Sequence, residues 1–167
     1  MRLLLCLHCK AAQLPVNLNI FAGMISMKCK YALKALVRLA RESDKKLLHT
    51  ADIARVENIP RKFLEQILLE LKHARLVKSK QGIGGGYYLV KNPKDISVAD
   101  IYRLFDGPIA PVLCVSLNFH EKCHDCTDEK NCILRDQFIN IREGARQVMS
   151  RVTIASFLPK KMHKKAN

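Results

Sequence analysis

The stretch from Asn58 to Val90 limits the possible fold more than any other part of the chain. Apolar residues recur there at the spacing of one helical face, and so predict an amphipathic helix. They are Phe63, Leu64, Ile67, Leu68 and Leu71. Pro60 suits the first position of this helix, because its missing N–H would have no partner there. Two short runs, 76–80 and 87–90, then flank a glycine-rich turn, and a helix followed by such a hairpin is the outline of a winged helix.

Two further helices are predicted ahead of this stretch. Residues from Lys28 to Arg41 place apolar side chains at helical spacing, and a polar turn follows at 43–46. Thr50 is the predicted N-cap of a short helix over 51–56, because its hydroxyl can accept from a first-turn N–H. A short helix, a turn and a longer helix form a helix-turn-helix, whose second helix lies in the major groove. The predicted fold class is therefore mainly α with a small β-wing.

The charge of the chain predicts a polyanionic partner. The net charge is +14 and the pI is about 9.7. Aromatic residues are only 6% and Trp is absent, which argues against a stacking platform for single strands. No stretch approaches the roughly 18 apolar residues of a membrane span. Together with the predicted helix-turn-helix, the charge predicts double-stranded DNA as the partner. We expect a cytoplasmic protein with no membrane partner, and no enzymatic activity is proposed.

Four of the seven cysteines lie close together, at Cys114, Cys123, Cys126 and Cys132. This uneven spread favours a metal or redox site over a secreted disulfide framework. They fall in or beside a segment, 109–131, that shows no sustained period and is long for a loop unless it is functional. Four thiolates suit either structural zinc or an iron–sulfur cluster. A thiol oxidoreductase is a weaker alternative, because the C-x2-C pair lacks the βαβ context of such enzymes.

Two more helices are predicted beyond the hairpin. Ser97 opens the first, with Asp100 three residues on as an imperfect capping box. The second covers 133–152 and has an apolar stripe at spacings of three and four, which indicates a dimer seam. Thr153 is predicted to cap a final short turn that ends at 158.

Four parts of the chain together resemble the IscR/NsrR family of winged-helix bacterial repressors, to which CymR-like members without a cluster also belong. They are ISMKCKYALKAL from residue 25, IPRKFLEQIL from 59, LVKSKQGIGGGY from 76 and IYRLFDG from 101. The resemblance covers about 24–158. It implies that the outer face of the second helix enters the major groove and that the wing follows the neighbouring minor groove. The family often has Arg before the wing glycines, and Gln81 stands there in this chain, with Lys78 and Lys80 as substitutes.

The expected DNA-contacting residues therefore come from the first helix, the helix-turn-helix and the wing. They are Lys28, Lys30, Tyr31, Thr50, Arg61, Lys62, Glu65, Gln66, Lys78, Lys80, Gln81, Gly84, Gly85, Gly86 and Tyr87.

The resemblance also implies an iron–sulfur cluster held by Cys114, Cys126 and Cys132, with Cys123 as an extra thiol and candidate fourth ligand. The family's other ligands are missing. Arg135 stands where the family has His, and Lys30 stands where it has an acidic residue. Cluster type and fourth ligand stay open. The alternatives are a zinc-stabilised regulator and a cluster-free, thiol-responsive regulator of the same fold. The expected function is a dimeric regulator, a repressor by resemblance, that senses redox state, nitric oxide or cluster supply.

The predicted organisation has five parts. Residues 1–23 are an extension or an upstream reading of the start codon, and the pair Cys6 and Cys9 within it is weak evidence for metal. The DNA-binding domain covers 24–106, and the cysteine-rich loop covers 107–132. The dimerisation helix and its terminal turn cover 133–158, and a basic tail follows at 159–167.

Overall fold

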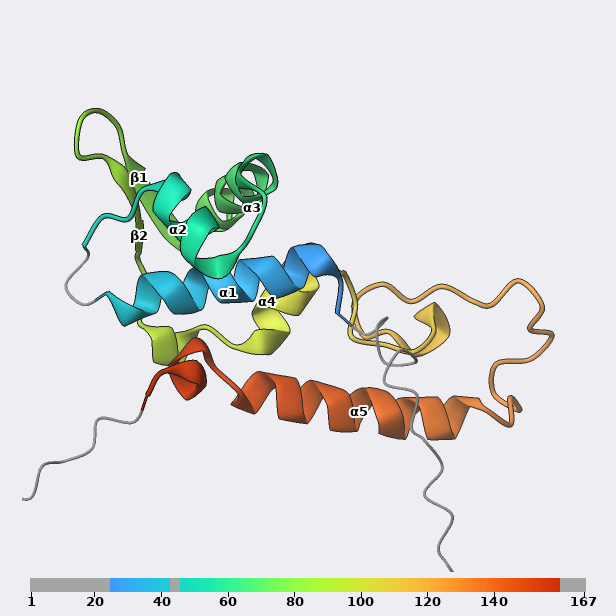
Figure 1. Ribbon diagram of the computed structural model, residues 1–167. Coiled ribbons are helices and arrows are strands. Elements are labelled where there is room, and N and C mark those ends of the chain that lie inside the picture. The colour runs from blue at the N-terminus through green and yellow to red at the C-terminus, as the bar shows by residue number, and fades with distance from the viewer. Residues whose placement is uncertain (1–24, 43–45, 160–167) are drawn as a thin grey trace, which may run out of the picture.

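The computed structural model describes residues 25–42 and 46–159, so the predicted extension and most of the basic tail lie outside the described residues. Its elements are α1 (Met27–Arg41), α2 (Thr50–Glu57), α3 (Arg61–His73), β1 (Val77–Lys80), β2 (Gly86–Leu89), α4 (Val98–Phe105) and α5 (Arg135–Arg151). Three 3-10 turns are Pro93–Asp95, Leu113–Val115 and Ile154–Phe157. In Figure 1, α1 to α4 and the hairpin form one body, and α5 runs along it. The predicted mainly helical fold with a small wing is confirmed.

A core of fully buried apolar side chains holds this body together. The largest are Leu36, Ile53, Leu64, Ile67, Leu68, Leu71, Ile96, Ile101 and Ile154. The predicted stripe of α3 is the face turned inward, because residues three and four apart share one side of a helix. α1 packs against α3 and α4, and α2 packs against α3. The inward stripe of α3 thus leaves its opposite face free.

The hairpin is antiparallel and is tied to the chain ahead of α2. Its register pairs Val77 with Leu89 and Lys80 with Gly86. Leu48 extends the sheet by one bridge to Tyr87, with reciprocal N–H to carbonyl bonds of 3.0 and 2.9 Å. Gly86 makes this approach possible, since a Cβ there would lie 2.5 Å from the Leu48 carbonyl oxygen. The wing is therefore fixed at its base.

Two predicted helix starts are wrong by one residue. Thr50 is the first residue of α2, and His49 is its N-cap. The His49 carbonyl accepts from the N–H groups of Asp52 and Ile53 at 3.0 and 3.1 Å, as an N-cap carbonyl does, and no side chain caps this helix start. Pro60 is the N-cap of α3 and not its first residue. Asn58 ends α2 in the left-handed conformation, with φ of 52°, and Pro60 has a non-helical ψ of 124°, so α3 begins only at Arg61.

The capping box predicted at α4 is complete. The Ser97 hydroxyl accepts from the Asp100 N–H at 3.1 Å, and the Ser97 N–H donates to the Asp100 carboxylate at 3.2 Å. Both bonds satisfy donors that the start of a helix leaves unpaired. The box fixes the start of α4 directly after the wing. At the other end, the Thr153 N–H donates to Ser156 Oγ at 3.1 Å where the predicted final turn begins.

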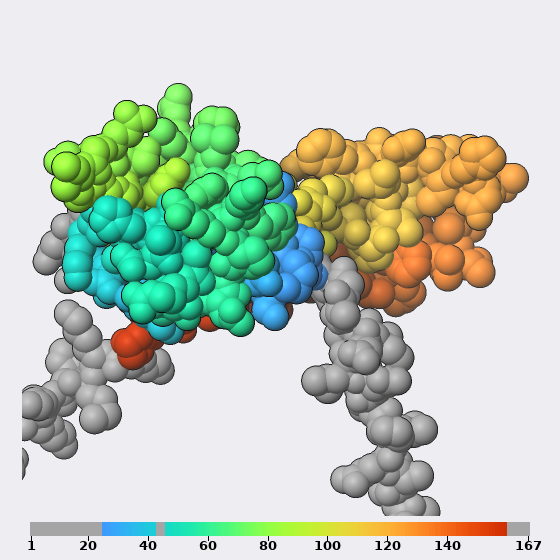
Figure 2. Space-filling view, turned by 45° about the horizontal axis from the view of Figure 1, so that its top comes forward, coloured from blue at the N-terminus to red at the C-terminus, as the bar shows by residue number. Residues whose placement is uncertain are grey.

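The cysteine segment, residues 107–134, connects α4 to α5 and has no regular structure except the 3-10 turn Leu113–Val115. α5 begins at Arg135, two residues later than predicted, and has no buried residue. Figure 2 shows the segment as a separate lobe over one end of α5, beside the body. Among the described residues, no helix is long and apolar enough to cross a membrane.

Candidate nucleic-acid interface and cysteine cavity

The outer face of α3 presents four predicted groove residues. Arg61, Lys62, Glu65 and Gln66 are all exposed. Arg61 Nε donates to Glu65 Oε1 at 2.9 Å, one helical turn away. An exposed ion pair of this kind is weak, so both side chains are free to exchange it for a contact with DNA. The structure therefore brings these four residues together on one free surface.

The wing, α3 and the start of α2 border a hollow beside this face. Its volume is about 600 Å³, and Thr50, Arg61, Lys80 and Gln81 line it together with wing glycines. Among the described residues, its one acidic lining residue is Asp52, which is paired with Arg55 at 3.2 Å. Lys78 and Lys80 are exposed. A concave surface lined by basic side chains suits a phosphate backbone. His49 and Lys72 also line the hollow and were not predicted, because each lies outside the motif positions of the sequence.

Three other predicted DNA contacts have structural partners inside the body. Lys28 Nζ lies 2.7 Å from Glu70 Oε1 and 5.5 Å from the centre of the Phe105 ring. Tyr31 meets Phe63 edge-on, with ring centres 5.9 Å apart. Tyr87 forms the bridge to the segment before α2, whereas Lys30 is exposed.

The wing glycines differ in what they do. A Cβ on Gly85 would collide with the carbonyl oxygens of Lys80 and Gly82, so this position is closed to larger residues. Gly84 has open space around it but a φ of +79°, which disfavours any residue with a side chain. The turn of the wing therefore depends on glycine for two separate reasons.

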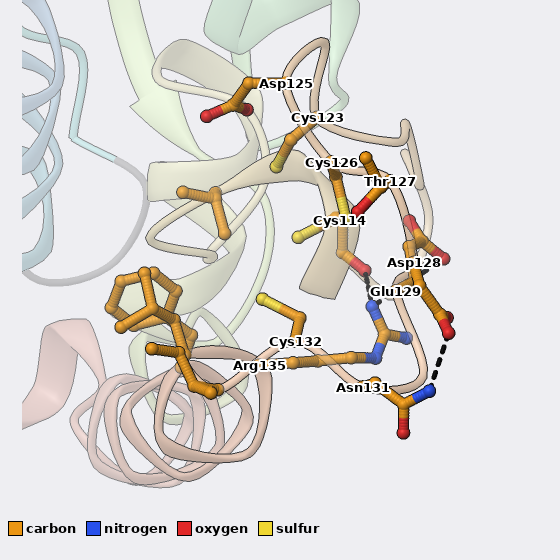
Figure 3. A pocket seen from close by; sticks show the side chains of 14 residues that line it. Cys114, Cys123, Asp125, Cys126, Thr127, Asp128, Glu129, Asn131, Cys132 and Arg135 are labelled. Atoms are coloured by element: carbon orange, nitrogen blue, oxygen red, sulfur yellow. Dashed lines mark hydrogen bonds and ion pairs between the residues drawn. The ribbon is translucent and has the colours of Figure 1, made fainter.

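All four predicted metal ligands line one cavity of about 550 Å³ (Figure 3). Cys114 is buried and comes from the 3-10 turn, whereas Cys123, Cys126 and Cys132 are half-buried. Cys132 lies directly ahead of α5, and all four are free thiols. The segment thus brings thiols that are up to 18 positions apart to one place.

The thiols influence one another. The pKa of Cys123 is raised, first by its hydrogen bond with Cys114 and then by burial and nearby negative charge. Burial, followed by the charge of Cys132, raises the pKa of Cys126. A negative thiolate disfavours ionisation of a neighbouring thiol, unless both thiolates share a cation. Soft metal centres provide that cation for sulfur ligands.

The described residues contain no finished metal site. Within 25–42 and 46–159, no three His, Cys, Asp or Glu side chains converge tightly enough to hold a metal ion. The cavity nevertheless gathers four cysteines, and thiolate sulfur is the donor that both structural zinc and iron–sulfur clusters use. By residue type, the donor set therefore suits either group.

Two arginines of α5 hold the cysteine segment in place. Arg135 Nη1 donates to the Cys114 carbonyl at 2.8 Å, and Arg142 Nη1 donates to the Val115 carbonyl at 2.5 Å. Their spacing of seven residues puts both on one side of α5. Arg135 was predicted only as a replacement for a family ligand, and its bond to the cysteine segment was not predicted. The spacing of seven residues between Arg135 and Arg142 was the sequence feature that could have indicated a shared role for them.

Comparison with known proteins decides the family. The Rrf2 family model, described as iron-dependent transcriptional regulator, matches residues 25–160. The chain belongs to the Rrf2 family of transcriptional regulators. An rrf2-like HTH-type regulator of Rhodobacter capsulatus is 44% identical over 121 residues, which cover 71% of this chain and 81% of that protein. CymR of Bacillus subtilis is 31% identical over 130 residues, covering 78% of this chain and 86% of that protein.

Solved structures of Rrf2 regulators share the fold. The structure of CymR, the global cysteine regulator of B. subtilis, superimposes with a TM-score of 0.64 at 32% identity, covering 79% of this chain and 93% of that chain. The structure of T. potens IscR superimposes with a TM-score of 0.62 at 25% identity, covering 79% and 83%. The resemblance to IscR-type and CymR-type regulators and the winged-helix prediction are both confirmed.

Proposed function

We propose that this Rrf2 protein is a homodimeric repressor that binds a double-stranded operator in the cytoplasm. In this proposal its cysteine cavity holds an iron–sulfur cluster and senses redox state, nitric oxide or cluster supply. The observation that supports the sensing role is the convergence of four thiols on one cavity. Two arginines of α5 also donate hydrogen bonds to the segment that carries these thiols. DNA binding rests on the free basic face of α3 and the adjoining wing.

The dimer is proposed from the surface of α5. Leu134, Ile141 and Val148 are spaced by seven residues and are 53%, 56% and 63% exposed. Side chains at this spacing share one side of a helix, and an exposed apolar stripe marks an interaction surface. A second copy of the same helix covers such a stripe symmetrically. Two DNA-binding bodies would then be joined through α5.

Cys114, Cys126 and Cys132 would supply three thiolates to the cluster, and Cys123 the fourth. Arg135 is a cation engaged with the Cys114 carbonyl, so it cannot take a ligand position. A bound cluster supplies a centre whose charge and integrity respond to oxidants and nitric oxide. Of the four thiols, Cys114 comes first in the chain and Cys132 last, so a cluster that bound both would join the 3-10 turn to the start of α5. Arg135 and Arg142 transmit a displacement of the Cys114 turn to α5, and so to the spacing of the two bodies.

The test begins with anaerobic purification, an optical spectrum and analysis of iron, sulfide and zinc. We expect a coloured protein that bleaches in air and whose DNA affinity changes on bleaching. Single Ser replacements of Cys114, Cys126 and Cys132 should abolish the colour. Cys29→Ala is the matched control, because Cys29 is a buried core residue of α1 outside the cavity.

Other results would separate the parts of the proposal. A colourless protein with one zinc per chain, and with DNA affinity indifferent to oxidants, would contradict the cluster and leave DNA binding intact. Colour that persists in Cys123→Ser would remove Cys123 from the ligand set. A monomer at micromolar concentration would contradict the α5 seam.

A further inference from the structure

The tip of the wing presents an isoleucine to solvent. Ile83 has an exposed fraction of 110%, the highest among the large apolar side chains of the described residues. Figure 1 shows the β1–β2 loop reaching out from the body, past the N-terminal end of α2. Ile83 therefore has no packing role in the body.

The turn holds Ile83 at its apex. The Gly85 N–H donates to the Gly82 carbonyl at 2.9 Å, which closes a four-residue turn around Ile83 and Gly84. A φ of +79° at Gly84 is the value expected at the third position of a type II turn. Nothing lies within 4 Å of a Cβ built on Gly82 or Gly84. The isoleucine thus stands between two residues without side chains, on a narrow and fixed loop.

The charges of the wing lie behind its tip. Lys78 and Lys80 are exposed on β1, whereas residues 81–86 contain no charged side chain. A basic stem can contact the phosphates at the edges of a minor groove while an uncharged tip lies between them. Apolar side chains enter the minor groove as wedges that unstack and kink a base step.

We propose that Ile83 enters the minor groove beside each half-site as an apolar wedge and selects base steps that open easily. This inference rests on the proposed DNA binding. An arginine at a wing tip is drawn to the negative potential of a narrow A-tract groove, but an isoleucine has no charge to gain from it. Ile83 instead gains free energy when its side chain moves out of water and contacts the sugars and an opened base step. Pyrimidine–purine steps such as TA and CA open more readily than A-tracts.

The experiment uses the full chain and an operator that the wild type selects from random duplexes. The flank next to the half-site is then made either a TA step or an A-tract, and binding is measured by fluorescence anisotropy. We expect the wild type to prefer the TA flank, and Ile83→Ser to lose about tenfold in affinity on it. Ile83→Leu should keep the preference, and Ile83→Arg should shift it toward the A-tract. Fluorescence energy transfer between the DNA ends should show a smaller bend with Ile83→Ser.

Salt dependence supplies the matched control. Ile83→Ser should leave the slope of affinity against salt unchanged, because no phosphate contact is lost, whereas Lys80→Ala should reduce that slope. Equal affinity and equal flank preference for Ile83→Ser and the wild type would overturn the wedge and leave DNA binding standing. A wild-type protein that binds no duplex at all would overturn both.

Discussion

The DNA-binding body and the cysteine segment are stabilised in opposite ways. The body has a continuous core to which every one of its helices contributes buried side chains. Within 107–134, by contrast, only Cys114, Val115 and Ser116 are buried. The body folds around its own apolar residues together with Ile154 from the turn after α5, and the segment is held by a few polar bonds to α5. A region of the second kind can respond to what binds it without unfolding the first.

The largest effect should come from the core of the body. Leu68→Ala removes a side chain with no exposed surface, so we expect unfolding stability to fall by about 2–5 kcal/mol. Leu117→Ala in the cysteine segment is the matched control, because Leu117 is 61% exposed and should change stability by less than about 0.5 kcal/mol. Urea unfolding measures both. Equal losses in the two variants would remove the distinction between the regions.

A smaller and local effect should follow from detaching the cysteine segment. Arg142→Ala leaves the buried Val115 carbonyl without its donor, which costs about 1–3 kcal/mol where no other partner replaces it. We expect faster amide exchange in 107–134 and an unchanged exchange pattern in α1 to α3. Arg151→Ala, at the exposed end of α5, is the control. Exchange that rises equally in both regions would show that the segment is part of the body's cooperative unit.

The same contrast explains what the sequence could predict. The body follows from helical periodicity and glycine positions, because its apolar residues alone determine which faces are buried. The errors there, at Thr50 and Pro60, were single-residue shifts of helix starts. The helix starts are set by local backbone conformation at His49 and Pro60, which apolar periodicity does not report.

The cysteine segment was predictable only as a set of residue types. The spacing of the four thiols indicated a metal or redox site but not their convergence on one cavity, which depends on long-range contacts. The bond from Arg135 to Cys114 spans 21 residues. In the DNA-binding body, the helical period was enough to predict that the outer residues of α3 are exposed. The ion pair of Lys28 with Glu70 could not be predicted, because it joins α1 to α3 and the sequence does not show how these helices pack.

The smallest effect should decide to which region α5 belongs. Gly144 lies inside α5, and a Cβ there would meet nothing within 4 Å. Gly144→Ala should therefore stabilise the helix by about 0.5–1 kcal/mol, since alanine loses less backbone freedom on folding. Gly107→Ala is the opposing control: the site is equally open, but its φ of +87° disfavours alanine, so stability should fall. If Gly144→Ala raises the urea midpoint of the whole protein, α5 unfolds with the body. If it slows amide exchange only in α5 and 107–134, the helix and the cysteine segment form a second cooperative unit. A change at the thiols can then reach the dimer seam through this unit while the DNA-binding body stays folded.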